Sequence, residues 1–240
     1  MRRAGFALIL AGLALAGRPC PAGEIDDARS LWEGFDPRGA PLEIEVARAW
    51  DEESSRLEEL YFTGETWEGE KARVFAYRGV PSGPAGPARV PGVLHIHGGG
   101  QTASIEWVKY WCRRGYASVS FDFCGKHPTR TGPHTLWGRV KGDMMTVGGG
   151  RILQPDPRHC PWFHWALAAR RALTLLEEHP RVDGGRLGIF GISVGGTLTW
   201  IVAGTDERVK AAVPIYGCGW DSYPKPWDDP SEPVLSLIHI

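Results

Sequence analysis

The stretch RLGIFGISVGGTLTW, residues Arg186–Trp200, decides how this sequence is interpreted. Its first half is a short apolar run typical of a buried strand, its second half is able to open a helix, and Ser193 lies between Gly191 and Gly195. In the pattern G-x-S-x-G, glycines allow a sharp turn that lifts the serine hydroxyl clear of the sheet. A helix amino terminus behind the serine favours developing negative charge. The pattern predicts a nucleophile on a strand-to-helix turn; a chance pentapeptide without function is the alternative.

A second stretch, VLHIHGGGQ, supports the first. The glycines follow an apolar strand, and they allow backbone N–H groups to approach a reacting oxygen without side chains in the way. Acyl transfer passes through a tetrahedral oxyanion, which needs two such donors aimed at one point. We expect one donor at Val194 and the other in the loop of Gly99, Gly100 and Gln101. Alone, this loop would be interpreted as a tight turn.

The flanking sequence predicts the architecture. Residues 41–80 alternate enough to indicate antiparallel strands joined by turns. The Pro- and Gly-rich segment PSGPAGPARVP is then a surface connection. From residue 93 onward, the apolar runs VLHIH, YASVSFDF, RLGIFG and VKAAVPIYG alternate with stretches of helical spacing, including IEWVKYWCRRG and WFHWALAARRALTLLEEH. This alternation favours a mostly parallel sheet with helices on both faces.

Together these motifs resemble the α/β-hydrolase family across roughly residues 42–217. The segments HIHGGGQTAS, FDFCG and GIFGISVGGTLTW are similar to those of exported esterases of the dienelactone hydrolase and acetylxylan esterase kind. The resemblance implies an α/β-hydrolase fold and a serine esterase without metal or organic cofactor. Substrate class follows less directly, since this scaffold hosts many chemistries.

The family order is serine, then an acid, then a histidine. Asp221 follows the last apolar run and is a candidate acid; His239 is the only histidine after Ser193, and it is the penultimate residue. The ending LSLIHI resembles a translated sequencing-library adaptor, so we hypothesise that the native sequence ends near Val234 and that residues 235–240 are a non-native tail. A genuine apolar strand is the alternative. On this hypothesis residues 24–234 form a hydrolase domain that is incomplete at its C-terminus.

The N-terminus has the plan of a secretory signal peptide over residues 1–23. Arg2 and Arg3 precede a short apolar stretch, which small residues and prolines follow. We expect cleavage between Gly17 and Gly23 and a secreted or periplasmic protein; a single membrane anchor is the competing interpretation.

Composition gives no indication of binding to nucleic acid, of a membrane span or of a metal site. The sequence is 42% hydrophobic and 23% charged, with a formal net charge of -1 and dispersed basic residues, which gives no indication of nucleic-acid binding. Beyond the leader no apolar run reaches about 18 residues, so no membrane span is expected in the mature chain. The remaining cysteines lack the spacing of a metal or redox motif, and export leaves open whether they are free thiols or disulfides; they are Cys112, Cys124, Cys160 and Cys218.

Other residues are expected to have structural roles. We predict that His95 packs in the core and that His97 shapes the loop. The histidines at 127, 134, 159 and 164 are interpreted as solvent-exposed loop residues; the alternative is that one of them reaches the mouth of the site. The tryptophans at 107, 111, 165 and 200 fall on expected helices and are assigned to the core. Those at 137, 162, 220 and 227 lie in or beside loops, where they could stack on a sugar or simply pack, and Trp220 is a candidate substrate contact.

The resulting hypothesis is an exported serine carboxylic ester hydrolase that deacetylates carbohydrate or another small ester through an acyl-enzyme on Ser193. A serine peptidase related to prolyl oligopeptidases is a variant of it. The alternative class is a non-catalytic protein, either a pseudo-enzyme or an inactive fragment.

Overall fold

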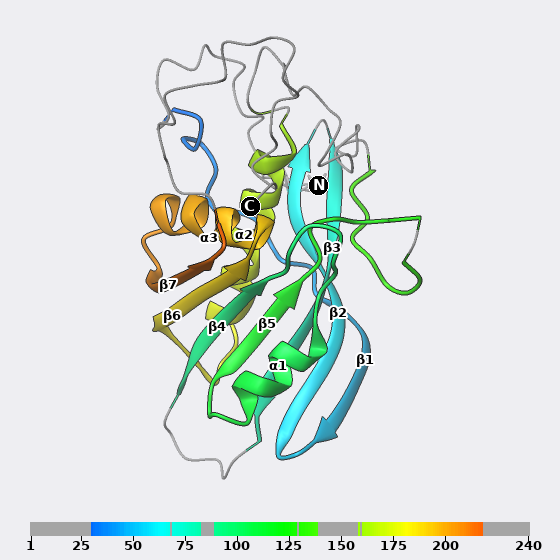
Figure 1. The fold of residues 1–240 in the computed structure, drawn as a ribbon, viewed down its shortest axis with the longest axis vertical. Helices are drawn as coiled ribbons and strands as arrows, with labels where there is room; N and C mark the ends of the chain where they lie inside the picture. The colour runs from blue at the N-terminus through cyan, green and yellow to red at the C-terminus, as the bar shows by residue number, and fades with distance from the viewer. Residues whose placement is uncertain are drawn as a thin grey trace, which may run out of the picture.

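The structure is a computed structural model that describes residues 30–67, 69–82, 89–128, 130–138, 158 and 160–217. One seven-stranded sheet runs through the described part, in the order β1-β2-β3-β5-β4-β6-β7 (Figure 1). The first three strands are β1 (Glu45–Glu52), β2 (Ser55–Trp67) and β3 (Glu70–Pro81), and they pair antiparallel as predicted.

The remaining strands form the parallel half of the sheet. They are β4 (Val90–Ile96), β5 (Ala117–Phe121), β6 (Val182–Ile192) and β7 (Val209–Ile215). Parallel pairing joins β5 to β4, β4 to β6 and β6 to β7, whereas β3 joins β5 antiparallel. The sheet is therefore mixed, because the N-terminal strands extend the parallel half with antiparallel pairs.

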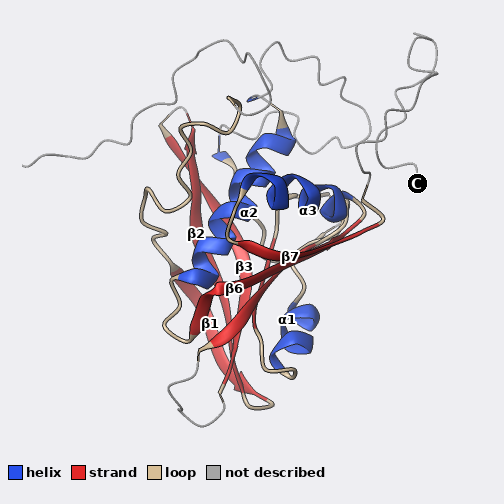
Figure 2. Ribbon diagram, turned by 90° about the vertical axis from the view of Figure 1, so that its left-hand side faces the viewer, coloured by secondary structure: helices blue, strands red, loops and turns tan. Residues whose placement is uncertain are grey.

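Helices cover both faces of the sheet (Figure 2). Helix α1 (Ile105–Cys112) lies on one face, and helices α2 (Pro161–Glu177) and α3 (Val194–Thr205) lie on the other. Helices α1 and α2 lie in the two stretches in which helical spacing was predicted. Helix α3 begins directly after Ser193, where the sequence predicted that a helix opens. No helix among the described residues is both long enough and apolar enough to cross a membrane.

The main core lies between the sheet and helices α2 and α3. It contains fully buried side chains from β2, β4, β5 and α2, such as Phe62, Leu94, Phe121 and Leu173. A smaller cluster beneath α1 joins Leu57, Val108 and Cys112. Burial of these apolar side chains is the main driving force for the fold.

A buried arginine fastens the N-terminal segment to this core. Arg171 on α2 is 2% exposed and donates to the carbonyls of Thr63 and of the segment 37–41, at Pro37, Ala40 and Pro41, over 2.6–3.1 Å. Backbone carbonyls satisfy the guanidinium donors, which makes a buried charge tolerable.

Candidate active site

Ser193 occupies a strained turn between β6 and α3. Its backbone has φ 57° and ψ -116°, outside the regions that residues with a side chain normally adopt. Such a conformation costs on the order of 1–3 kcal/mol and persists only where the surroundings impose it. Here the Ser193 N–H donates to Ile215 O at 2.8 Å, and its carbonyl accepts from Thr197 N at 3.0 Å. The turn is thus held from both sides, as the sequence pattern predicts.

The glycines around Ser193 are required by close backbone approach. A Cβ on Gly191 would lie 2.2 Å from Gly195 O, and a Cβ on Gly195 would lie 2.2 Å from Ile96 O. A Cβ on Gly196 would lie 2.5 Å from Ile215 O. Because backbone atoms cannot yield as a flexible side chain can, the elbow packs onto β4 and β7 only with glycine at these positions.

The glycine loop after β4 lies beside this elbow. Gly98–Gln101 form a β-turn in which the Gln101 N–H donates to Gly98 O at 3.2 Å and Gly100 has φ 71°, a value that favours glycine. A Cβ on Gly99 would lie 2.9 Å from Val194 Cγ2, so the loop and the elbow are in contact. The structure therefore brings together the two motifs that the sequence analysis paired.

Within the loop, the N–H groups differ in availability. The Gln101 N–H is engaged in the turn. Burial raises the pKa of the Cys124 thiol, and the N–H of Gly100 opposes part of that rise. The Gly99 N–H donates to no acceptor among the described residues. Val194 is the first residue of α3, where the N–H has no partner within the helix. The four residues of the sequence-based hypothesis thus reduce to two candidate donors, Gly99 and Val194.

His97 is locked beneath the loop. It is 1% exposed, its ring stacks on Phe123 with centroids 4.0 Å apart, and its Nδ1 lies 2.7 Å from Gly98 O. Since that carbonyl only accepts, Nδ1 carries a proton, and Nε2 lies 3.3 Å from Phe123 N and 3.4 Å from Asp122 Oδ1. His97 has the loop-shaping position that we predicted.

His95 belongs to the core, also as predicted. It is 2% exposed and bonds to Ser120 Oγ at 2.8 Å through Nδ1. Burial, with a smaller contribution from His97, lowers its pKa to about 3. The imidazole therefore stays neutral at physiological pH.

Asp122 is a buried carboxylate beside the glycine loop, and the sequence analysis assigned it no role. This fully buried carboxylate accepts the N–H groups of Gly125 and Thr135 at 2.9 and 2.8 Å, and Thr102 Oγ1 at 3.4 Å. Burial opposes its ionisation, but these backbone donors together with His97 hold the pKa of Asp122 below its usual value. Its place in FDFCG, directly after β5, was the available signal.

The Ser193 hydroxyl makes no hydrogen bond with any described residue, and the side chain is half-buried and reachable from solvent. The candidate acid Asp221, the candidate substrate contact Trp220 and His239 lie outside the described residues, as do His159, Trp227 and Cys218.

Several assignments from the sequence are wrong. Trp107 and Trp111 were assigned to the core, but both are half-buried and belong to neither core cluster, and Trp107 lines a pocket. His164 is a buried residue of α2 rather than an exposed loop histidine, because it bonds to the buried Glu65 of β2 and packs edge-on against Trp67. Trp200 is 46% exposed on α3 and is not part of the core. Trp137, in contrast, is 4% exposed and donates to Phe123 O, so it packs and is not available for a sugar.

The described cysteines are free thiols: Cys112 and Cys124 are buried, and Cys160 is half-buried. Burial raises the pKa of Cys112 to about 11. No cluster of metal-ligating side chains occurs among the residues that the structure describes.

The chain is similar to acetyl xylan esterases. A family model described as acetyl xylan esterase (AXE1) matches residues 42–221. The acetyl xylan esterase from Paenibacillus sp. R4 has a TM-score of 0.56 and 20% identity, over 75% of this chain and 55% of that chain. Acetyl Xylan Esterase 1 from Thermoanaerobacterium sp. JW/SL YS485 has a TM-score of 0.51 and 22% identity, over 71% of this chain and 50% of that chain.

This chain thus spans about half the length of those two structures. The likeness shows a shared α/β-hydrolase fold, as predicted. None of the curated proteins with which the sequence was compared matches it.

Proposed function

This chain belongs to the acetyl xylan esterase (AXE1) family, and on that premise we propose that it is a serine carboxylic ester hydrolase acting on acetylated carbohydrate or another small ester. The observation that supports the proposal most is the strained Ser193 turn in contact with the glycine loop. Two motifs about a hundred residues apart meet at one point only if the fold brings them there, and acyl transfer needs both.

In the proposed reaction, Ser193 Oγ attacks the acyl carbon of the ester. The carbonyl oxygen becomes an oxyanion and accepts the N–H groups of Gly99 and Val194. The helix dipole of α3 adds favourable potential at the same place. The alcohol leaves, the acyl group stays on Ser193, and water releases it as the acid. The proton acceptor for Ser193 has to come from outside the described residues.

The test is hydrolysis of p-nitrophenyl acetate by the 240-residue chain and by Ser193→Ala, each with and without added imidazole. A histidine within the chain gives Ser193-dependent turnover without imidazole. If the chain lacks that base, free imidazole replaces it, and only the protein with Ser193 responds above the rate of imidazole alone. Equal rates for both proteins under both conditions would contradict the proposal and favour a non-catalytic protein. Cleavage of proline-containing peptide amides in preference to esters would favour the peptidase variant.

We also propose that residues 1–23 direct export. The basic pair Arg2 and Arg3, followed by a short apolar stretch, supports this. Fusion of residues 1–30 to an alkaline phosphatase without its own leader should give activity outside the cytoplasm, and replacement of both arginines by glutamate should reduce it. A fusion protein that stays in the cytoplasm without phosphatase activity would contradict export.

A further inference from the structure

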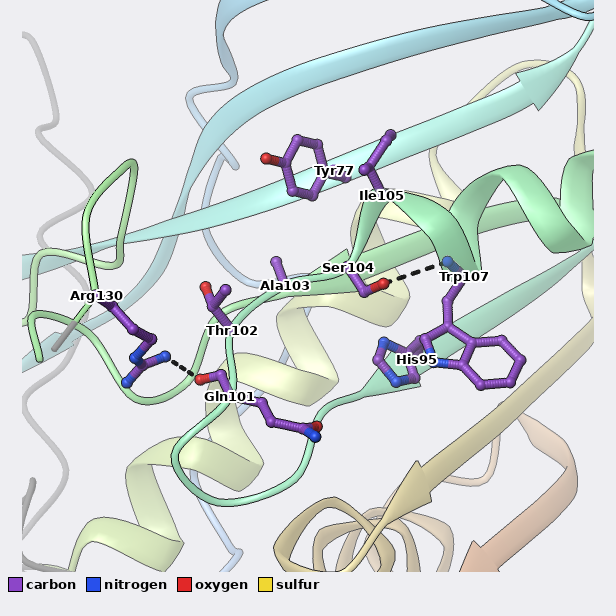
Figure 3. Close-up of a pocket in the computed structure, with 9 residues that line it drawn as sticks. All are labelled: Tyr77, His95, Gln101, Thr102, Ala103, Ser104, Ile105, Trp107 and Arg130. Atoms are coloured by element: carbon purple, nitrogen blue, oxygen red, sulfur yellow. Dashed lines mark hydrogen bonds between the residues drawn. The ribbon is translucent and has the colours of Figure 1, made fainter.

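Arg130 reaches across from the segment after β5 to the glycine loop (Figure 3). Its Nη1 donates to the backbone carbonyl of Gln101 and lies 3.8 Å from Asp122 Oδ1. The side chain is 19% exposed, so these contacts form in partly desolvated surroundings, where charge interactions are stronger than in water.

Gln101 anchors the loop through three polar groups. Its N–H donates to Gly98 O, its side-chain Oε1 accepts the Gly98 N–H at 3.0 Å, and its carbonyl accepts from Arg130. The first two bonds close the turn on itself, whereas the third ties the turn to the rest of the protein. Arg130 therefore holds the loop in which Gly99 faces Val194.

The charge of Arg130 has a second effect. Asp122 is completely buried and ionised, and it bonds to Thr102, the residue that follows Gln101. An oxyanion forming at Gly99 would be repelled by this carboxylate if nothing offset it. The guanidinium of Arg130 lies next to Asp122 and supplies the opposite charge.

From these contacts we infer that Arg130 is a positioning residue for the acyl-transfer step, an inference that rests on the proposed function. It fixes the Gly99 donor through the Gln101 carbonyl and offsets the charge of Asp122, which bonds to Thr102 next to the loop. Arg130 does not touch the reacting atoms. Its removal should therefore lower the rate of the chemical step and leave substrate binding nearly unchanged.

A ligand-binding role for Arg130 fits the structure less well. Arg130 and Gln101 line a pocket of about 500 Å³ on the α1 side of the sheet, with Tyr77, His95 and Trp107 (Figure 3). The Nε and Nη2 atoms of Arg130 lack partners among the described residues, but they are shielded from solvent. A ligand in the pocket would not reach them, whereas the contact with the loop already exists.

The experiment compares Arg130→Met and Arg130→Lys with the parent chain in the p-nitrophenyl acetate assay, under the condition that gives Ser193-dependent turnover. Arg130→Met should lower kcat roughly 10- to 100-fold with KM within about 2-fold. Arg130→Lys should recover part of the loss, because it restores the charge but not the planar geometry. Arg113→Met, which removes the exposed arginine that caps the C-terminus of α1 and pairs with Glu53, is the matched control and should leave kcat unchanged.

Amide hydrogen exchange gives a readout that does not require turnover. The Gln101 amide should exchange at least about 5-fold faster in Arg130→Met, and at the parental rate in both Arg113→Met and Ser193→Ala. Faster exchange without Ser193-dependent turnover in any protein would support the positioning role and refute the proposed function. Parental exchange and parental kcat in Arg130→Met would overturn the inference, as would a kcat loss that Arg130→Lys does not reverse even in part.

Discussion

Gly99 and Val194 are in direct contact: a Cβ on Gly99 would lie 2.9 Å from Val194 Cγ2. The first residue belongs to the loop after β4 and the second begins α3, so the two candidate oxyanion donors come from different chain segments that pack against each other. A change of a few tenths of an ångström here alters the distance from both donors to the same oxygen.

A double-mutant cycle tests that contact. Gly99→Ala should displace the loop and lower kcat for p-nitrophenyl acetate roughly 10-fold, because one donor moves out of line. Val194→Ala removes Cγ2, so the added methyl fits, and the double variant should recover most of the loss. Additive losses in the double variant would show that the two residues act separately.

Two glycines of α3 provide a matched pair for stability. A Cβ on Gly195 would lie 2.2 Å from Ile96 O, whereas a Cβ on Gly204 meets nothing within 4 Å. Gly195→Ala should lower the free energy of unfolding by more than about 2 kcal/mol, because backbone must move. Gly204→Ala should raise it by about 0.4–1 kcal/mol, since alanine restricts the unfolded chain. Urea titrations of both variants measure the difference, and equal effects would refute the close packing of the elbow.

The strain at Ser193 has a measurable consequence. Glycine adopts φ 57° readily, so Ser193→Gly should relieve about 1–3 kcal/mol of strain while losing about 0.5–1 kcal/mol to the entropy of the unfolded chain. The free energy of unfolding of Ser193→Gly should therefore exceed that of Ser193→Ala by about 1 kcal/mol. A less stable glycine variant would show that the turn is unstrained.

Asp122 should make stability depend on pH. Its pKa is lowered in the folded chain, so the stabilisation by the carboxylate is fully present above its unfolded pKa, about 3.9, and is lost as pH falls through the folded value. At pH 7, Asp122→Asn should be less stable by about 2–3 kcal/mol, because Arg130 loses its buried partner and one N–H loses an acceptor. In urea unfolding the difference should shrink between pH 4 and pH 2.5; a constant difference would contradict the role of the charge.

The sequence allowed the local structure to be predicted where it depends on nearby residues. The period-2 strands before residue 80, the apolar strand and helix alternation after residue 93, and the G-x-S-x-G turn all appear in the structure. The roles of Gly191 and Gly195 could be predicted from the sequence, because the steric limits at such a turn depend on backbone geometry alone.

Contacts between distant segments could not be predicted. Glu65 and His164 form a buried pair although 99 residues separate them, and an isolated histidine gives no sign of such a partner. The sequence around Arg171 likewise did not indicate that its guanidinium would bind the carbonyls of residues 37–41. The role of Arg130 in holding Gln101 likewise depends on how the segment after β5 folds back.

The exposure of Trp200 could not be predicted for a related reason. Tryptophan on a helix usually packs, and α3 is apolar on most sides, so its sequence does not distinguish the buried Leu198 from its exposed neighbour. The arrangement of α3 against β6 and β7, which decides burial, is a tertiary property.

The most direct measurement is the identity of the residue that carries the acyl group. The chain is mixed with p-nitrophenyl acetate under the condition that gives turnover, quenched in acid within the first turnovers, digested and analysed by mass spectrometry. Acetylation should appear on the peptide containing Ser193 and disappear on longer incubation as water releases the acetyl group, and Ser193→Ala should lack it. Acetate found only on lysines or on another serine, at equal levels in Ser193→Ala, would contradict an acyl-enzyme at Ser193.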